Sequence, residues 1–440
     1  MQISLINSQK DEAGLNIARQ FDELIDQKRI AAHDRITPTA DFQLVEVGER
    51  LIYQDGIDQS VDTDLIIFLS RHTSKHSLPL LTVHAPGNIG VADLGGKPNS
   101  IPPTSPTWMK AVFNNLLQYA PQKYKVTYEV THHGPTELDT PSFFVEIGST
   151  HSEWIDPAAG RAVAQSIFEA VPRDSIHLLG LGGNHYASRV TKIAKESRAA
   201  FGHIIHTRDL PLLDSRLITT LRDRSGAVAA YIDRNSVPND SASRIEGLLT
   251  TINLSTIGER ELVSIGDLRF ETFIAIIHLA QEISSKSHPI VHHLTGEGDL
   301  SIVTVDANLL IEALRSNAKK VRKGIENLPL AHLTTTDGSI LPKFITFERY
   351  RSKLINDLIN LCVKIIIGYQ KTSIDGDFLF IHKLQFDPAK ARKLGIPMGP
   401  LYGMLSSGQS VEVDGRVITP AMVHTECTKI LYIPGLERYV

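Results

Sequence analysis

The chain has 440 residues, of which 42% are hydrophobic and 21% are charged, and its formal net charge is −4. This composition is that of a globular protein long enough for two domains, and the negative charge argues against a protein that coats nucleic acid. The only two cysteines, Cys362 and Cys427, lie far apart, which excludes a disulfide scaffold and a thiolate zinc site.

The sequence contains no signal for membrane insertion or export. No run of about 18 apolar residues is present, so we expect no membrane-spanning helix. The first twenty residues, MQISLINSQKDEAGLNIARQ, have no basic region followed by an apolar one and do not resemble a signal peptide. We therefore expect a cytoplasmic protein.

Short apolar runs alternate with amphipathic stretches in the first part of the chain, which is typical of an α/β domain. Residues 3–6 predict a strand, and residues 11–26 predict a helix with one apolar face. Further strands are expected at 42–47, 65–69, 80–85, 125–133, 143–148, 176–182 and 202–206, and further helices at 107–120, 157–171 and 189–201. Because several strands are apolar throughout, we expect a mixed or mainly parallel sheet with helices on both faces.

Unusual polar residues follow four of these expected strands. The segments are TVHAPGN at 82–88, EVTHHGPT at 129–136, VEIGSTHSEW at 145–154 and LLGLGGNHY at 178–186. Ligands of open α/β sheets bind beyond the carboxyl ends of the strands, so we expect these four loops to line one pocket.

The four loops and the following strand contain several possible metal ligands. Neutral imidazole and carboxylate groups bind zinc where thiolates are absent, with three protein ligands and one open position in a catalytic site. The candidates are His84, His132, His133, Glu146, His151, His185 and His206. No HExxH or other strict metal signature is present. If His132 and His133 belong to a strand, they point to opposite faces, unless the turn at Gly134 and Pro135 has already begun.

Some of these histidines have a simpler explanation. A histidine at the end of a strand more often caps a turn or bonds to the backbone than binds a metal, and this reading is favoured for His151, His203 and His206 taken singly. Glu146 is different, because an apolar strand would have to bury its carboxylate, and such carboxylates are rare unless they are paired or bound to a metal.

A glycine-rich turn separates an expected strand from an expected helix at GLGGNHY. Gly182 and Gly183 could hold a phosphate or carboxylate at the start of the helix, or could simply form a tight turn. His185 and Tyr186 follow directly and could supply an acid, a base or a ligand together with a stacking face.

Beyond about residue 290 the pattern changes to a strand and two helices in 293–328, a long helix in 347–369, and alternating strands with an Asp-Gly hairpin signal in 410–418. Residues 290–440 contain 18 Lys and Arg against 15 Asp and Glu, or +3, which leaves −7 for residues 1–289. We expect one domain at 1–289 and a smaller α+β domain at 290–440, whose basic excess permits contact with an RNA backbone.

The motifs SQKDEAGLNIA, HAPGN, THHGPTELDTPSFFVEIGSTHSEW and GLGGNHYASRVTKIA resemble those of the archaeal and plant type of D-aminoacyl-tRNA deacylase, and they occur in the order of that family. The motif residues that match are His84, His132, His133, Glu146, Glu153, Trp154, Gly182, Gly183, His185 and Tyr186. One departure is Ser188, where the family pattern leads us to expect proline.

The resemblance implies a zinc-dependent hydrolase that cuts the ester joining a D-amino acid to the 3′ end of tRNA, on a fold related to phosphorylases and peptidyl-tRNA hydrolases. Zinc lowers the pKa of water to about 7 and polarises a carbonyl, and a nearby histidine or glutamate can transfer the proton. The expected partner is D-aminoacyl-tRNA, and no obligate protein partner is indicated.

Roles follow from the same resemblance. The catalytic candidates are His132, His133, Glu146 and His185. The zinc ligands are expected to be a subset of His84, His132, His133, Glu146 and His185. The candidates for binding substrate are Gly182, Gly183, Tyr186, Glu153 and Trp154. Two alternatives remain, namely a phosphorylase-like or peptidase-like hydrolase on the same fold, and a non-catalytic module that binds the tRNA end with a structural zinc.

Residues 386–423 look like the C-terminal segment of the tRNA 3′-processing endonuclease of the metallo-β-lactamase type. The HxHxDH metal motif of that family is absent from this chain, so nuclease activity is not implied. The segment could share a role near the tRNA end, or it could be an unrelated loop and hairpin.

Overall fold

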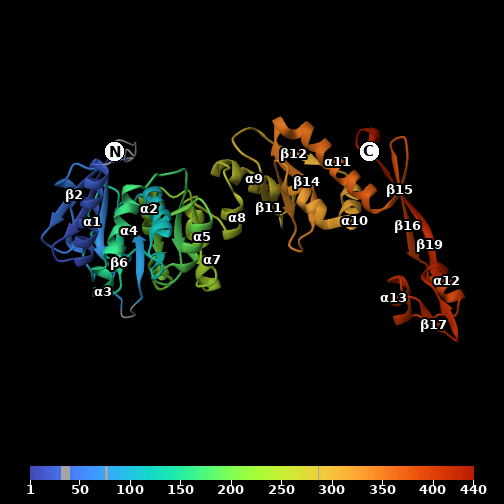
Figure 1. The fold of residues 1–440 in the computed structure, drawn as a ribbon, viewed down its shortest axis with the longest axis horizontal. Helices are drawn as coiled ribbons and strands as arrows, with labels where there is room; N and C mark the ends of the chain where they lie inside the picture. Colours follow the sequence, from blue (N-terminus) through green and yellow to red (C-terminus); the bar gives the residue numbers. More distant parts are fainter. Residues whose placement is uncertain (31–39, 75–77, 286) are drawn as a thin grey trace. The chain divides into compact units, whose positions relative to one another are not determined.

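The structure is a computed structural model that describes residues 1–440 except 31–39, 75–77 and 286 (Figure 1). The chain divides into two compact units, Met1–Val263 and Ser264–Val440. This division lies earlier than the boundary after residue 289 that we expect from the sequence. The reason is that α9 (Phe270–Ile283) contacts β11 (His288–His292) and β14 (Ile340–Phe347), and so packs within the second unit.

The first sheet of the first unit has six strands in the order β2-β1-β3-β6-β4-β5. Strands β2, β1, β3 and β6 are parallel to one another, whereas β4 is antiparallel to β6 and parallel to β5. The strands are β1 Gln2–Ser8, β2 Asp41–Val47, β3 Leu65–Arg71, β4 Leu80–His84, β5 Lys125–Tyr128 and β6 Ser142–Gly148. The sheet is therefore mixed and mainly parallel, as the sequence predicts.

Helices pack against this sheet and against each other. They are α1 Glu12–Ile30, α2 Pro106–Tyr119, α3 His151–Trp154 and α4 Pro157–Phe168, with two short 3₁₀ turns, η1 Leu51–Tyr53 and η2 Ile57–Gln59. The apolar face predicted for α1 is confirmed, because Ala13, Ile17, Phe21 and Leu24 are all buried. Burial of this face holds the helix against β1 and β3.

A second sheet in the same unit has four parallel strands in the order β10-β9-β7-β8. They are β7 Ile176–Leu181, β8 Ala199–Ile205, β9 Ala229–Ile232 and β10 Ser255–Thr256. The accompanying helices are η3 Thr207–Leu212, α5 Ser188–Glu196, α6 Ser215–Ser225, α7 Asn239–Thr251 and α8 Glu259–Ser264. The prediction of helix up to residue 201 was wrong, because residues 199–201 are buried in β8 and pair with β7.

The strand predicted at 125–133 is also shorter than expected. β5 ends at Tyr128, and the chain then turns towards the second sheet. The Val130 N–H donates to the His185 carbonyl at 3.0 Å, and the Thr131 N–H donates to the Ile204 carbonyl at 2.7 Å. These two bonds end the strand, and they bring the loop after β5 beside the loop after β7.

The second unit contains a four-stranded antiparallel sheet in the order β11-β13-β14-β12, a three-stranded sheet β15-β16-β19 and a hairpin β17-β18. The strands not yet given are β12 Leu300–Thr304, β13 Leu330–Thr334, β15 Lys371–Asp375, β16 Phe378–Phe386, β17 Val411–Val413, β18 Arg416–Ile418 and β19 His424–Tyr432. The helices are α10 Ala307–Glu326, α11 Arg351–Tyr369, α12 Pro388–Lys393, α13 Pro400–Ser406 and α14 Pro420–Val423, with 3₁₀ turns η4 Glu348–Tyr350 and η5 Leu436–Arg438. The predicted α+β character and the Asp-Gly hairpin, at Asp414 and Gly415, are confirmed.

Among the described residues, no helix combines the length and the apolar character needed to cross a bilayer.

Candidate metal centre and active site

A pocket of about 240 Å³ in the first unit is lined by residues from three of the four expected segments, and no residue of 82–88 is among them. Its lining residues are Lys10, Asp11, Arg50, Leu51, Ile52, Ser70, Arg71, His72, Thr73, Leu94, His132, His133, Glu146 and His185. The expectation that the site lies at one edge of a parallel sheet needs correction. Because β4 is antiparallel to β6, His84 at the end of β4 pairs with Phe144 near the start of β6.

His84 and Glu146 nevertheless belong to one face of the first sheet. Cross-strand partners point to the same face, and alternate residues of a strand do so as well. Thr82 pairs with Glu146 and His84 pairs with Phe144, so all four side chains share a face. The site is therefore built on the face of β4 and β6 and not at a common edge.

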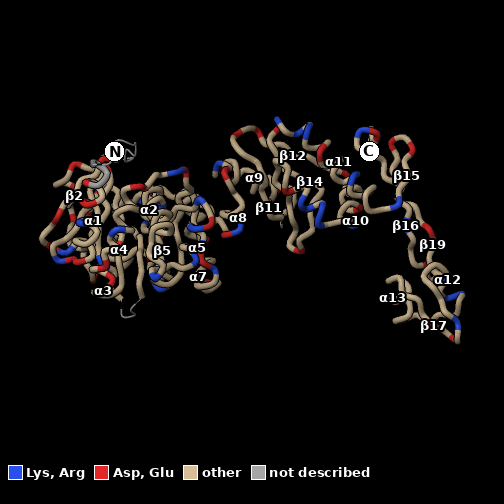
Figure 2. Tube along the Cα trace, in the orientation of Figure 1, with Lys and Arg blue, Asp and Glu red and all other residues tan. Residues whose placement is uncertain are grey.

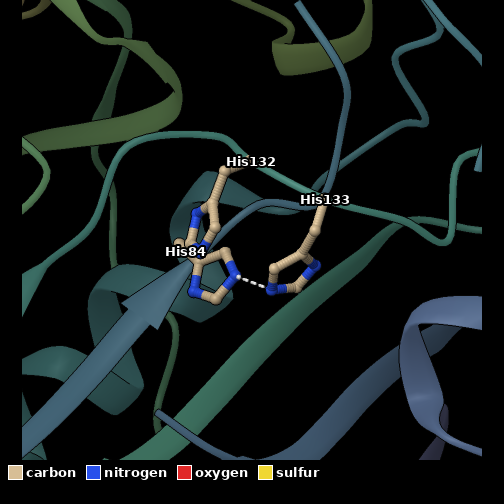
Figure 3. A group of neighbouring side chains, drawn as sticks. All are labelled: His84, His132 and His133. Atoms are coloured by element: carbon tan, nitrogen blue, oxygen red, sulfur yellow. Dashed lines mark hydrogen bonds between the residues drawn. The ribbon is translucent and has the colours of Figure 1, made fainter. Parts of the chain in front are cut away.

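Three histidines meet over this face (Figure 3). The Nε2 atoms of His84 and His133 are 3.3 Å apart, and the rings of His84 and His132 stack with centroids 4.5 Å apart. The ring of Phe144 stacks on His84 with an interplanar angle of 8°. The imidazole of His84 is thus held between two other rings, which fixes the direction of its nitrogen atoms.

The adjacent histidines of the loop both face His84, because the turn has already begun at this point. His133 has a φ of 53°, which reverses the strand alternation that would have separated the two rings. Its carbonyl accepts a hydrogen bond from the Gly87 N–H at 2.8 Å. The sequence left this question open, and the backbone conformation answers it.

Backbone carbonyls also determine which ring nitrogen of His132 and of His133 keeps a lone pair that could bind a metal. The Nδ1 atom of His132 lies 2.7 Å from the Val130 carbonyl, and the Nδ1 atom of His133 lies 2.7 Å from the Gly134 carbonyl. Each Nδ1 therefore carries the proton, and each Nε2 keeps its lone pair. This arrangement of the second ring nitrogen is the one that metal-binding histidines usually show.

Glu129 is the centre of a second group of side chains that the sequence analysis did not identify. Its fully buried carboxylate lies 3.0 Å from His72 Nδ1, 3.0 Å from His185 Nε2 and 3.7 Å from His132 Nε2. The signal that could have found it is the one used for Glu146, namely a carboxylate within an apolar segment, YEV at 128–130.

His72 links the two buried carboxylates. Its Nδ1 is 3.6 Å from Glu146 and its Nε2 is 3.2 Å from the Tyr186 hydroxyl. Tyr186, a candidate for binding substrate, therefore holds His72. His72 carries no distinctive sequence signal, because it is a single histidine directly after an apolar strand.

Burial keeps the imidazoles of His84, His132 and His133 neutral. Desolvation lowers the pKa of His132 to about 4 and that of His133 to about 3. Desolvation and the neighbouring His132 hold the pKa of His84 well below its usual range. A neutral imidazole has the lone pair that a metal ligand needs.

The two carboxylates respond differently to the same environment. Burial, aided by the charge of Glu129, raises the pKa of Glu146 to about 8. Burial opposes ionisation of Glu129 as well, but its contacts with His185 and His72 hold its pKa well below the usual range. Burial alone would lower the pKa of His72, yet Glu129 and Glu146 raise it to about 11.

The donor set fits a metal ion that binds nitrogen and oxygen ligands. Three groups of side chains have ligand atoms within 4.8 Å of one another: His84, His132 and His133; His72, Glu129 and His185; and His84, Glu129 and Glu146. Two ligands of a tetrahedral zinc ion lie about 3.3 Å apart, because each bond is about 2.0–2.1 Å long. Among the described residues, both Glu129 oxygens and His84 Nδ1 are buried without a hydrogen-bond partner of acceptable geometry.

The structure places Glu153 and Trp154 outside the lining of the pocket. Glu153 accepts hydrogen bonds from the Thr150 N–H at 2.9 Å and the Thr150 hydroxyl at 2.6 Å, which forms a capping box for α3. Trp154 donates its Nε1–H to the His72 carbonyl at 3.0 Å. Both side chains thus have partners within the fold, and neither is among the residues that line the pocket.

Two N–H groups of the glycine-rich turn already donate hydrogen bonds within the fold. The Gly182 N–H donates to the Ile205 carbonyl and the Gly183 N–H to the Thr207 hydroxyl, both at 2.9 Å. Gly182 has a φ of 100° and Gly183 has a φ of 112°. A Cβ atom on Gly182 would lie 2.4 Å from the side chain of Val237. The turn needs glycine for its conformation and packing, and it offers neither of these two N–H groups to a phosphate.

The three histidines for which the sequence favoured a structural role have hydrogen-bond or ion-pair partners within the fold. His151 is exposed and lies 3.4 Å from Glu12. His203 is buried between the Thr131 hydroxyl and the Pro102 carbonyl, and His206 accepts a hydrogen bond from the Arg208 N–H. These contacts agree with the structural reading that the sequence favoured for each of them.

Comparison with known proteins gives consistent results. The family model for D-aminoacyl-tRNA deacylase matches residues 59–257. A Methanoculleus marisnigri protein named D-aminoacyl-tRNA deacylase is 47% identical over the full length of both chains. A Methanosarcina mazei protein of the same name is 37% identical over 59% of this chain and 93% of its own. A crystal structure of a conserved protein of unknown function matches with a TM-score of 0.54 and 32% identity, covering 60% of this chain and 96% of its own.

Proposed function

The chain belongs to the D-aminoacyl-tRNA deacylase family, and on this basis we propose that it hydrolyses the ester of D-aminoacyl-tRNA to free D-amino acid and tRNA. The observation that supports this reaction most directly is the pocket described above. Buried imidazoles and carboxylates converge there within the residues that match the family. Ester hydrolysis needs such groups to activate water, to stabilise the carbonyl oxygen and to protonate the leaving ribose oxygen.

Zinc is the metal that we propose for this site. His84, His132 and His133 would hold it, because one ring nitrogen of each lies within 4.8 Å of the others. Backbone carbonyls fix the rings of His132 and His133, and stacking on Phe144 fixes that of His84. When bound, zinc lowers the pKa of water and polarises a carbonyl, which are the two effects that ester hydrolysis requires. The donor set without thiolate also suits other divalent ions, so the identity of the metal has to be measured.

His185 supplies the proton transfers in this proposal, with Glu129 behind it. The His185 side chain is 38% exposed and lines the pocket, so it can accept a proton from the attacking water and pass it to the ribose oxygen. The buried Glu129 carboxylate lies 3.0 Å from His185 Nε2, where it stabilises the imidazolium that forms in between. Glu146 and Tyr186 position His72 behind Glu129.

The apolar residues that line the pocket are Leu51, Ile52 and Leu94. We place the amino-acid side chain there. Discrimination against the L-ester needs a steric obstacle in addition to attraction, and a wall on one side of the reacting carbonyl supplies such an obstacle to one of two mirror-image esters.

For the second unit we propose an accessory role in contacting tRNA. Lys319, Lys320, Arg322 and Lys323 on α10 are exposed, and no salt bridge among the described residues involves them. Figure 2 marks the lysines and arginines along the chain in blue. The M. mazei relative matches 59% of this chain, close to the 60% (263 of 440 residues) that the first unit comprises. Both observations are consistent with a catalytic first unit and a second unit that some relatives lack.

The test of the proposed function is incubation of the purified chain with matched D- and L-aminoacyl-tRNA, with and without a chelator. We expect release of free D-amino acid, little release of the L-enantiomer, and loss of activity on chelation. Binding of charged tRNA without turnover would favour the non-catalytic alternative. Turnover of nucleosides or peptides but not of the ester would favour the other hydrolase classes.

A further inference from the structure

Two arginines line the pocket beside the metal centre without an obvious role in the chemistry. They are Arg50 and Arg71. A third cation of the lining, Lys10, already pairs with Glu49 at 2.5 Å. For the two guanidinium groups, no carboxylate or hydrogen-bond acceptor is found among the residues that the structure describes, and each lies instead over an aromatic ring.

Arg71 is held firmly at the end of β3. Its backbone N–H donates to the Asp11 carboxylate at 3.0 Å, and its guanidinium lies 5.2 Å from the centre of the Trp154 ring. Trp154 in turn donates its Nε1–H to the carbonyl of His72. One indole therefore positions both the cation and the neighbouring histidine of the site. Stacking leaves the N–H groups at the edge of a guanidinium free to bind an anion.

Arg50 is exposed and precedes η1, where its guanidinium lies 5.9 Å from the centre of the Tyr53 ring. The acidic side chains of the pocket do not neutralise either arginine. Asp11 accepts bonds from the Ala13 and Gly14 N–H groups as well as from Ser70 and Arg71. Glu146 is buried against His72.

We propose that Arg71 and Arg50 form a phosphate-binding subsite for the phosphodiester next to the 3′-terminal nucleotide of the substrate. This inference rests on the proposed function. In an aminoacyl ester the α-carboxyl group is esterified, so for every amino acid without an acidic side chain the phosphates are the only anions that the substrate brings. The planar fork of a guanidinium matches phosphate oxygens in a bidentate manner. Fixing this phosphate places the terminal ribose, and with it the ester, over the metal centre.

The subsite also explains why Trp154 belongs to a motif of the family although it does not line the pocket. Its side chain acts through Arg71, and it is a positioning residue in this proposal. The same holds for Asp11, whose carboxylate caps the start of α1 and fixes the backbone of Arg71. The chain thus orients the anion-binding group from two sides before substrate arrives.

The experiment compares two esters of the same D-amino acid, one on full tRNA and one on adenosine, which has no phosphate. We expect Arg71→Gln to lower kcat/KM for D-aminoacyl-tRNA about 10- to 100-fold, as loss of charged hydrogen bonds does. Hydrolysis of D-aminoacyl-adenosine should be unchanged. Arg71→Lys should recover part of the loss, because it restores the charge but not the fork.

Arg50→Gln provides a second variant at an exposed position that does not threaten folding, and we expect the same selective loss. Arg216→Gln, which changes an exposed arginine of α6 outside the pocket lining, is the matched control and should leave both substrates unaffected. Equal losses on both esters, or no loss on tRNA, would overturn the subsite. A change only in inhibition by free D-amino acid would also overturn it, since the arginines would then bind the product carboxylate. If the unaltered protein hydrolyses neither ester, the proposed function itself fails.

Discussion

The Nε2 atoms of His84 and His133 face each other at 3.3 Å, although 49 positions separate the two residues in the sequence. The Nδ1 of His133 lies 2.7 Å from the Gly134 carbonyl and so carries the proton of that ring. Its Nε2 therefore presents a lone pair towards His84. Two imidazoles that converge in this way need a proton or a metal ion between them, and the third histidine stacked beside them favours a metal.

We predict that the purified chain contains a stoichiometric metal, which elemental analysis would measure. His84→Ala and His133→Ala should each lower the metal content, because each removes one converging nitrogen. Activity should disappear on chelation and return when zinc is added. A protein without stoichiometric metal whose activity survives chelation would contradict the metal mechanism and leave the substrate open.

His132→Ala should reduce kcat about 100-fold or more with little change in the temperature of unfolding. The reason is that His132 faces Glu129 and His84 in the pocket and contributes little to the core. His151→Ala is the matched control, because that histidine is exposed on α3, where it forms a salt bridge with Glu12. Lower thermal stability with near-normal specific activity would show that His132 is a structural turn residue.

Removal of the charge of Glu153 should lower stability but not kcat, whereas removal of the charge of Glu129 should lower kcat. Glu153→Ala should lower the free energy of unfolding by about 1 kcal/mol, because it breaks the capping box of α3, while kcat stays close to normal. Glu129→Gln should lower kcat strongly, because its carboxylate contacts three histidines of the site. Chemical denaturation and steady-state kinetics on both variants would measure the contrast. A large loss of kcat in Glu153→Ala would restore it as a candidate for binding substrate.

The second unit should lose stability in acid through Glu312. This buried carboxylate of α10 forms ion pairs with Lys383 and Lys429, the latter at 3.0 Å, and with Arg315. Burial opposes ionisation, but the two lysines hold the pKa of Glu312 below its usual range. A carboxyl group whose pKa is lower in the folded state stabilises the fold above its unfolded pKa of about 4.5, and this contribution is lost as the pH falls through the folded pKa.

Glu312→Gln should therefore unfold more readily at pH 7 and show a weaker loss of stability between about pH 5 and pH 3 than the unaltered chain. We expect a cost of about 2 kcal/mol, below the ~3–5 kcal/mol of a fully buried pair because the lysines remain partly exposed. Glu326→Gln, at an exposed position of the same helix, is the control. Denaturant unfolding as a function of pH measures both variants, and identical acid profiles would contradict the role of Glu312.

Removal of the second unit should weaken binding of tRNA without impairing the chemistry. A chain ending at Val263 should show a higher KM for D-aminoacyl-tRNA and a flatter dependence on salt, with kcat largely retained, because phosphate contacts position RNA and weaken steeply with salt. Substituting the exposed cations of α10 in the full chain separates lost contacts from lost folding. If the KM for D-aminoacyl-tRNA and its dependence on salt are unchanged in both the shortened chain and the substituted full chain, the second unit does not bind tRNA.

The sequence by itself determined the local features of this protein. The periodicity of residues 11–26 predicted α1 and its buried face, and the Asp-Gly signal predicted the β17-β18 hairpin, because both depend on residues close together in the chain. The carboxylate in the apolar strand identified Glu146 as a buried acid, since an apolar environment on both sides is visible in the sequence. The same signal is present at Glu129, which lies in the segment YEV at 128–130.

Only the tertiary structure decided how these features combine. The antiparallel direction of β4 puts His84 beside Phe144, and the two bonds from Val130 and Thr131 to the second sheet end β5 and expose Glu129 to His72 and His185. Strand order, direction and register depend on hydrogen bonds between segments distant in the chain, and no local pattern encodes them. Glu146 and most of the histidines could therefore be named from the sequence, whereas His72 could not, and which of these groups face one another is a property of the folded chain.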